Sequence, residues 1–302
     1  MQIQKCTYGG WDNCLELVND KVRLVITLDV GPRVIFYGFL DGQNVLNNIE
    51  DDMGKTGGDE WRCYGGHRLW HAPEVSPRTY FPDNELVPYE QEGSRIILDC
   101  PPEHNNNLKK VIEIELAEDS TEVQLFHRIY NIGMWDMEFS AWCLTVMAPG
   151  GRAIIPQEPF VAHGDGAGES FDPARPLVLW QYTNMADPRF TWGTKYIQMS
   201  EDASIDCKQK IGLLNKQAWM AYALNGELFL KKQEYQEGVE YPDYNCNAEL
   251  FTMPNFFEIE TFSPLKKVAP GDYIENRETW ELFKLNVSKD EADIDAKLLP
   301  LI

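Results

Sequence analysis

The chain has 302 residues, of which 43% are hydrophobic and 12% aromatic, so it has enough apolar surface to form a folded core. It carries 48 acidic against 27 basic side chains, and this net charge of −21 excludes nucleic acid and anionic membrane surfaces as favoured partners. No apolar run approaches the roughly 20 residues of a membrane span. Seven scattered cysteines without a CxxC pair indicate reduced thiols, so we expect a cytoplasmic protein that binds a small molecule.

Alternating hydrophobic residues predict three β-hairpins along the chain. Gly31-Pro32 separates the strands of the first hairpin, and Asn225-Gly226, a pair suited to a tight turn, separates those of the third. A short helix is expected near the C-terminus, with Ser288 as its cap. The predicted strand pairs are 22–28 with 34–37, 112–116 with 123–129, and 219–224 with 227–232, and the helix covers 289–298.

Many strands at short spacing with few helical periods predict an all-β fold of stacked, mostly antiparallel sheets. No change in composition divides the chain, so residues 1–302 are expected to form one domain. Long irregular segments within such a domain are usually functional, so we expect them to wall a ligand cleft. These segments are 51–66, 70–88, 163–176 and 236–247.

The segment 61–74, WRCYGGHRLWHAPE, is the densest group of chemically useful side chains. Gly65-Gly66 allows the backbone to approach a ligand closely, and aromatic rings stack on the apolar face of a sugar. The alternative is a turn whose Trp and His side chains fill the core. The candidate binding residues from this segment are His67, Arg68, Trp70, His71 and Glu74.

A metal site is not expected in this segment. His67 and His71 are four residues apart, as metal ligands on one helix face are, but Pro73 and the residues between them argue against a helix.

The segment 256–264 predicts a strand with Glu258 and Glu260 on one face and Phe257 and Ile259 on the other. Two neighbouring carboxylates raise the pKa of one of them, which suits a general base. A solvated edge strand with two unimportant acids is the alternative, and a glycosidase pair formed with Glu74 is another.

This glutamate strand, with the Pro270-Gly271 turn and the aromatic strand 278–283, resembles the C-terminal end of the aldose 1-epimerase (galactose mutarotase) superfamily. Together with Gly65-Gly66-His67-Arg68-Leu69-Trp70, it looks like an uncharacterised bacterial branch of that superfamily, known as a domain of unknown function. The resemblance implies a β-supersandwich of two large sheets with few short helices. It also implies a carbohydrate substrate, no cofactor, and Glu260 as the catalytic base.

The family's acid histidine usually follows a strand near mid-chain, where this chain has Trp142 and Cys143. We therefore assign the acid to His67, because its ordinary pKa near 6.5 suits proton exchange at neutral pH. His71 and His163 are the alternatives. The residues expected to bind substrate are Arg68, Trp70, His71, Glu74, Trp142 and Glu258.

The predicted function is interconversion of sugar anomers by general acid and base catalysis on a neutral or weakly charged carbohydrate. A non-catalytic sugar-binding protein on the same scaffold is one alternative, and a protein related to glycoside hydrolases or lyases is another. Lys231 and Lys232 could receive a phosphate or uronate, or form a solvated pair. His127 is expected in the core and His104 on the surface.

Overall fold

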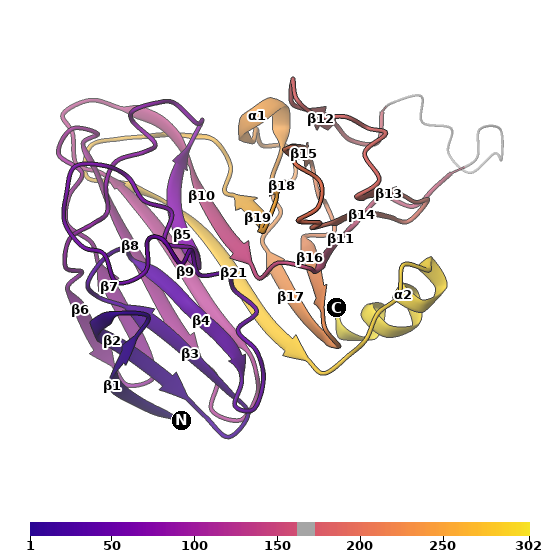
Figure 1. The fold of residues 1–302 in the computed structure, drawn as a ribbon. Helices are drawn as coiled ribbons and strands as arrows, with labels where there is room; N and C mark the ends of the chain where they lie inside the picture. The colour runs from indigo at the N-terminus through magenta and orange to yellow at the C-terminus, as the bar shows by residue number, and fades with distance from the viewer. Residues whose placement is uncertain (162–172) are drawn as a thin grey trace.

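The computed structural model describes residues 1–161 and 173–302. His163 and the glycine-rich segment 164–169, which was expected to form a flap, lie outside the described residues. The described chain is almost entirely β, as predicted, and forms two large sheets packed face to face (Figure 1). Within these residues every strand pair is antiparallel.

The first sheet contains both chain segments that the sequence singled out. In spatial order its described strands are β1 (Gln2–Tyr8), β2 (Trp11–Val18), β3 (Val22–Thr27), β4 (Arg33–Phe39), β5 (His67–Ala72), β10 (Met137–Met147), β19 (Phe256–Phe262), β18 (Ala248–Met253), β15 (Gln209–Leu213) and β12 (Leu177–Leu179), with β20 (Lys266–Val268) paired to β10. The strands β5, β10, β19, β18 and β15 are therefore consecutive neighbours, although they come from distant parts of the chain.

The second sheet packs against one face of the first. In spatial order its described strands are β13 (Phe190–Trp192), β14 (Tyr196–Ser200), β11 (Arg152–Pro156), β16 (Trp219–Leu224), β17 (Glu227–Gln233), β21 (Tyr273–Phe283), β9 (Val123–Asn131), β8 (Leu108–Leu116), β7 (Arg95–Asp99) and β6 (Tyr89–Glu92). The core between the sheets includes Ile26 of β3, Phe257 and Ile259 of β19, and Ile112 of β8. The other face of the first sheet is therefore free to carry polar side chains.

The three predicted hairpins are confirmed as β3–β4, β8–β9 and β16–β17. Asn225 and Gly226 have φ angles of 48° and 82°, which match the turn that this pair favours. The helical elements of the described chain are α1 (Pro242–Asn245), α2 (Glu291–Leu298) and the 3₁₀ turn η1 (Leu299–Leu301).

The predicted C-terminal helix is present, but its cap is not Ser288. Asp290 is the cap, because its carboxylate accepts from the backbone N–H groups of Ala292 and Asp293, and α2 starts at the next residue. No helix in the described part of the chain is long and apolar enough to cross a membrane. All seven cysteines fall within the described residues, and each is a free thiol.

Candidate active site

The segment around Gly65-Gly66 differs from the expected loop, because residues 67–72 form the central strand β5. Successive side chains of a strand point to opposite faces of the sheet. Arg68 and Trp70 therefore lie on the face that points away from the second sheet. His67 and His71 point toward the second sheet.

Seven large or charged side chains gather on the face of the first sheet that points away from the second sheet. Phe257 and Ile259 pack in the core, so Glu258 and Glu260 point the other way, as predicted. We call this group the Glu260 cluster; its members are Arg68, Trp70, Trp142, Lys210, Glu249, Glu258 and Glu260. They come from β5, β10, β15, β18 and β19.

Glu260 is fully buried and only half satisfied by the protein. Its Oε2 accepts a hydrogen bond from Trp142 Nε1 at 2.9 Å and contacts Lys210 Nζ at 3.2 Å. Its Oε1 is buried and has no hydrogen-bond partner among the described residues. A buried carboxylate oxygen without a partner costs free energy, so this atom is left as an unsatisfied hydrogen-bond acceptor.

The predicted partner of Glu260 on the same strand, Glu258, is already bound. Arg68 Nη1 lies 2.8 Å from Glu258 Oε1, and both side chains are almost completely buried. Burial raises the pKa of Glu258, and Arg68 opposes that effect. Arg68 also lies 4.4 Å from the ring centroid of Trp70. This ion pair therefore positions the arginine and the tryptophan rather than providing a second free carboxylate.

Aromatic rings cover one side of the Glu260 cluster. The rings of Trp70 and Trp142 pack edge to face, with their centroids 5.3 Å apart. The ring centroids of Trp61 and Tyr80 lie 5.1 and 5.0 Å from that of Trp70. The Trp61 Nε1 donor is buried without a described partner. Aromatic faces beside unpaired polar atoms are typical of a carbohydrate site.

Lys210 and Glu249 were missed in the sequence, although they belong to this cluster. Lys210 Nζ lies 2.6 Å from Glu249 Oε2 and also contacts Glu260. Both side chains point away from the core because their neighbours Ile211 and Leu250 are core residues. The same alternation in the sequence could have placed each on a strand face, but their proximity depends on strand pairing.

Glu74 and His71 do not join the cluster in the way that was expected. Glu74 follows β5, is exposed, and accepts a hydrogen bond from Tyr80 Oη. His71 is 1% exposed on the opposite face of the sheet, and neither of its ring nitrogens has a hydrogen-bond partner among the described residues. His71 therefore cannot contact a sugar bound at Glu260.

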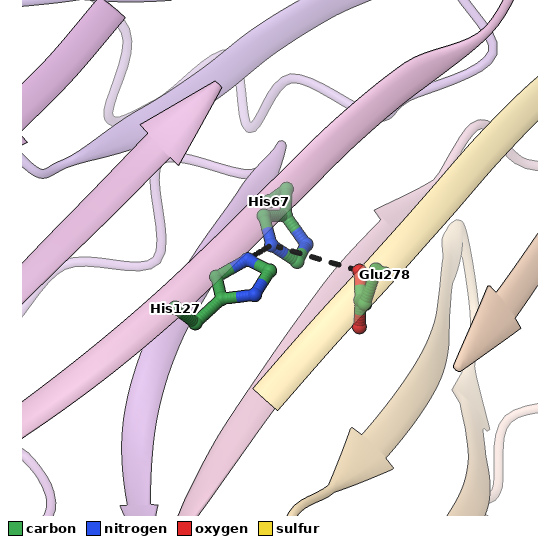
Figure 2. Close-up of side chains that lie close together, drawn as sticks. All are labelled: His67, His127 and Glu278. Carbon is green, nitrogen blue, oxygen red and sulfur yellow. Dashed lines mark hydrogen bonds and ion pairs between the residues drawn. The ribbon is translucent and has the colours of Figure 1, made fainter. Parts of the chain in front are cut away.

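His67 is buried between the sheets, where both nitrogens of its imidazole ring take part in a chain of hydrogen bonds. His127 Nδ1 donates to the carbonyl oxygen of Asn276 at 3.0 Å, so His127 Nε2 accepts from His67 Nε2 at 2.8 Å. His67 Nδ1 then accepts from Thr145 Oγ1 at 2.9 Å. Figure 2 shows the two imidazoles in contact with each other, with Glu278 beside them. Burial lowers the pKa of both histidines, and the hydrogen-bond chain is satisfied with both of them neutral.

The two predicted catalytic residues are therefore not brought together. His67 and Glu260 lie on opposite faces of the same sheet. His67 points from β5 toward the second sheet, whereas Glu260 points from β19 away from it. His127 is a core residue and His104 is exposed, as predicted. Lys231 also differs from the expectation, because it is buried between the sheets and not in a solvated pair.

His67, His127 and Glu278 are close enough to be considered as metal ligands. However, His67 Nε2 and His127 Nε2 share a proton at 2.8 Å, and a metal ion would have to displace it. The ammonium of Lys231 lies 2.8 Å from Glu278 Oε1 and would repel the ion. The hydrogen bonds account for this inter-sheet cluster without a metal.

Comparison with solved structures supports the architecture. A galactose mutarotase-like protein from Lactobacillus casei superposes with a TM-score of 0.56 at 10% identity, covering 90% of this chain and 100% of its own. Another from Clostridium acetobutylicum superposes with a TM-score of 0.56 at 11% identity, covering 93% and 98%. The chain has the galactose mutarotase-like fold.

A galactose mutarotase related enzyme from Lactobacillus acidophilus shares this fold, with a TM-score of 0.53 at 8% identity over 90% of this chain and 97% of its own. No protein-family model matches the sequence, and no curated protein sequence matches it. The predicted fold class is therefore confirmed by structure rather than by sequence similarity.

Within the galactose mutarotase-like fold, the unpaired and buried His71 predicts a measurable pH dependence of stability. Burial, followed by Lys110 and Arg78, lowers its pKa to about 2, so the unfolded chain binds a proton at His71 below pH 6.5 that the folded chain does not. Wild type should therefore lose stability relative to His71→Leu by about 1.4 kcal/mol per pH unit as the pH falls below about 6.5.

Urea unfolding of both proteins from pH 7.5 to pH 5 checks this expectation. Comparing the two slopes is necessary because burial raises the pKa values of Glu249 and Glu258, whose titration acts on stability with the opposite sign. His104→Gln, at an exposed histidine, should follow the wild-type profile. Parallel profiles for wild type and His71→Leu would contradict the assignment.

Proposed function

We propose that this protein is an aldose 1-epimerase-like enzyme that interconverts the anomers of a neutral sugar. The observation that carries the proposal is Glu260. One of its carboxylate oxygens is oriented by Trp142 and Lys210, and the other is buried without a hydrogen-bond partner among the described residues. A fixed carboxylate with one free oxygen is suited to accept a proton.

Anomer exchange requires a base that removes the proton of the anomeric hydroxyl group and an acid that protonates the ring oxygen. The bond between C1 and the ring oxygen breaks, the open aldehyde rotates about its C1–C2 bond, and the ring closes on the other face with the roles reversed. Glu260 is the base in this proposal. The acid is another group on the same face, since His67 points to the second sheet.

The charges of the site favour an unphosphorylated sugar. Arg68 is paired with Glu258, and Lys210 is paired with Glu249 and Glu260, so both cations of the Glu260 cluster are already neutralised. A phosphate or uronate would have to compete with these carboxylates. The earlier candidate Lys231 is buried between the sheets.

The free thiols further support a reducing compartment, and we place the protein in the cytoplasm.

The test uses freshly dissolved α-glucose and α-galactose with polarimetry or magnetisation-exchange NMR. We expect anomer exchange to be faster with the protein than in buffer, and tryptophan fluorescence to change on sugar binding because Trp70 and Trp142 lie at the site. Glucose 6-phosphate and glucuronate should bind more weakly. Binding without faster exchange would indicate a non-catalytic sugar-binding protein, and release of products from an oligosaccharide would indicate a hydrolase or lyase.

Trp142→Phe should slow exchange by about 10-fold while sugar binding is retained. The substitution preserves an aromatic ring but removes the Nε1–H donor to Glu260, and a hydrogen bond to a charged group contributes about 1.5–3 kcal/mol. Trp70→Phe is the matched control, because Trp70 packs against Trp142 without bonding to Glu260. Equal rates for the two variants would show that the hydrogen bond does not position the base.

A further inference from the structure

The Glu260 cluster holds more carboxyl groups than cations. Glu249, Glu258 and Glu260 are three carboxyls, whereas Arg68 and Lys210 are two cations, and all five side chains are less than 9% exposed. Arg68 is paired with Glu258, so Lys210 remains to neutralise both Glu249 and Glu260. Burying an unpaired charge is costly, so one of these two carboxyls must hold a proton.

Hydrogen-bond donors determine which carboxyl is ionised. Glu260 Oε2 receives Trp142 Nε1–H at 2.9 Å and lies 3.2 Å from Lys210 Nζ. Among the described residues Glu249 has no donor except Lys210, whose Nζ lies 2.6 Å from Glu249 Oε2, and neither Glu249 oxygen makes a hydrogen bond of good geometry. The donors therefore favour the ionised form of Glu260 and leave the proton to Glu249.

A fourth carboxyl, Asp243, supports this distribution. Asp243 is partly buried and lies close enough to Glu249 to interact with it electrostatically, and a neighbouring negative charge disfavours the ionised form of Glu249. Burial raises the pKa of Glu249 well above its usual range, and Asp243 adds to that effect. Glu249 is also faced by Tyr182 and by the thiol of Cys246.

The backbone around Asp243 has an unusual conformation. Asp243, Tyr244 and Asn245 have φ angles of 50°, 61° and 75°, so three consecutive non-glycine residues of α1 adopt the left-handed region. The turn is closed by Asn245 Oδ1, which accepts from the Tyr241 N–H at 3.0 Å, and by a 2.8 Å bond from the Cys246 N–H to the Pro242 carbonyl. Strained backbone of this kind is found where a functional group must be positioned.

We propose that Glu249 is the proton donor that works opposite Glu260. This rests on the proposed function. Glu249 and Glu260 are directly opposite each other in the register of β18 and β19, so their side chains stand next to each other on one face. The anomeric oxygen and the ring oxygen of a sugar share one carbon, so two adjacent carboxyl groups reach both atoms.

The proton balance of the cycle is complete without another reactant. Glu260 takes the proton of the anomeric hydroxyl, the bond from C1 to the ring oxygen breaks, and Glu249 gives its proton to that oxygen. After rotation, Glu249 takes this proton back while the ring oxygen bonds to C1. Glu260 then returns its proton to the carbonyl oxygen.

Glu249→Gln should slow anomer exchange by about 100-fold or more while sugar binding, followed by tryptophan fluorescence, is retained. Glutamine has nearly the same shape as glutamic acid but cannot donate an acidic proton. Glu240→Gln, at an exposed glutamate near α1, is the control and should exchange at the wild-type rate. Far-UV circular dichroism confirms that each variant is folded. If wild type catalyses anomer exchange and Glu249→Gln is equally active, the inference is overturned and the proposed function stands.

Asp243→Asn tests the proton on Glu249 by removing a neighbouring negative charge. Glu249 loses a negative neighbour that favours its protonated form, so the alkaline limb of the pH–rate profile should move about one unit to lower pH, with the rate on the acidic side retained. An unshifted limb would overturn the role of Asp243.

Infrared spectroscopy tests the proton itself without relying on turnover. Wild type at neutral pH should show a carbonyl band of a protonated carboxylic acid that is lost in Glu249→Gln, and a band that persists unchanged would overturn the inference. If wild type shows this band but exchanges no sugar anomers, the proposed function fails and the catalytic role of Glu249 fails with it.

Discussion

Replacing Glu260 with glutamine should reduce anomer exchange by about 100-fold or more while sugar binding is retained. Glutamine keeps the shape of the side chain and its contacts with Trp142, but its amide cannot accept a proton. Rates are measured by magnetisation-exchange NMR and binding by tryptophan fluorescence.

Glu258→Gln is the matched control for this prediction, because Glu258 lies two residues away on the same face of β19 but is paired with Arg68. It should alter the rate less than Glu260→Gln does. Wild-type exchange by Glu260→Gln would exclude Glu260 as the base. If both variants lost sugar binding together, the acids would position the ligand instead of transferring protons.

Replacing Lys231 with methionine should destabilise the protein by about 3–5 kcal/mol. The Lys231 ammonium lies 2.8 Å from Glu278 and 2.8 Å from Thr145 Oγ1, and the side chains of Lys231 and Glu278 are fully buried. Methionine fills a similar volume but leaves the Glu278 carboxylate in the core without its cation. Urea unfolding at pH 7, followed by tryptophan fluorescence, measures the loss.

The adjacent residue provides the control. Lys232 is paired with Glu281 at 3.0 Å, but these side chains are 30% and 22% exposed, so Lys232→Met should cost only about 1 kcal/mol or less. Lys231→Met combined with Glu278→Gln should recover part of the loss, since the uncompensated charge is removed. A Lys231→Met variant as stable as Lys232→Met would show that water or a relaxed core compensates the charge.

Local patterns were sufficient to predict the strands and the fold class. The alternation around Glu258 and Glu260 placed both carboxylates on one face, because a side-chain period of two is a property of any strand. Asn225-Gly226 predicted its turn for an equally local reason, the low cost of positive φ angles at these residues. The C-terminal helix was found, and only its cap was misplaced by two residues.

The face on which His67 lies could not be read from the same sequence. Gly65-Gly66 and Pro73 suggested a loop, in which neighbouring side chains can all reach one ligand. Once β5 pairs with β10, its alternation sends Arg68 and Trp70 to one side and His67 and His71 to the other. Strand pairing is a long-range interaction, so it determines this separation only in the folded protein.

The sequence by itself determined that this protein is built from antiparallel sheets and that Glu258 and Glu260 share a face, because both follow from local alternation of side chains. Only the tertiary structure decided which groups surround Glu260. Lys210 and Glu249 reach it through the lateral order of β15, β18 and β19. Which strands become neighbours depends on the packing of the whole core, and no short segment carries that information.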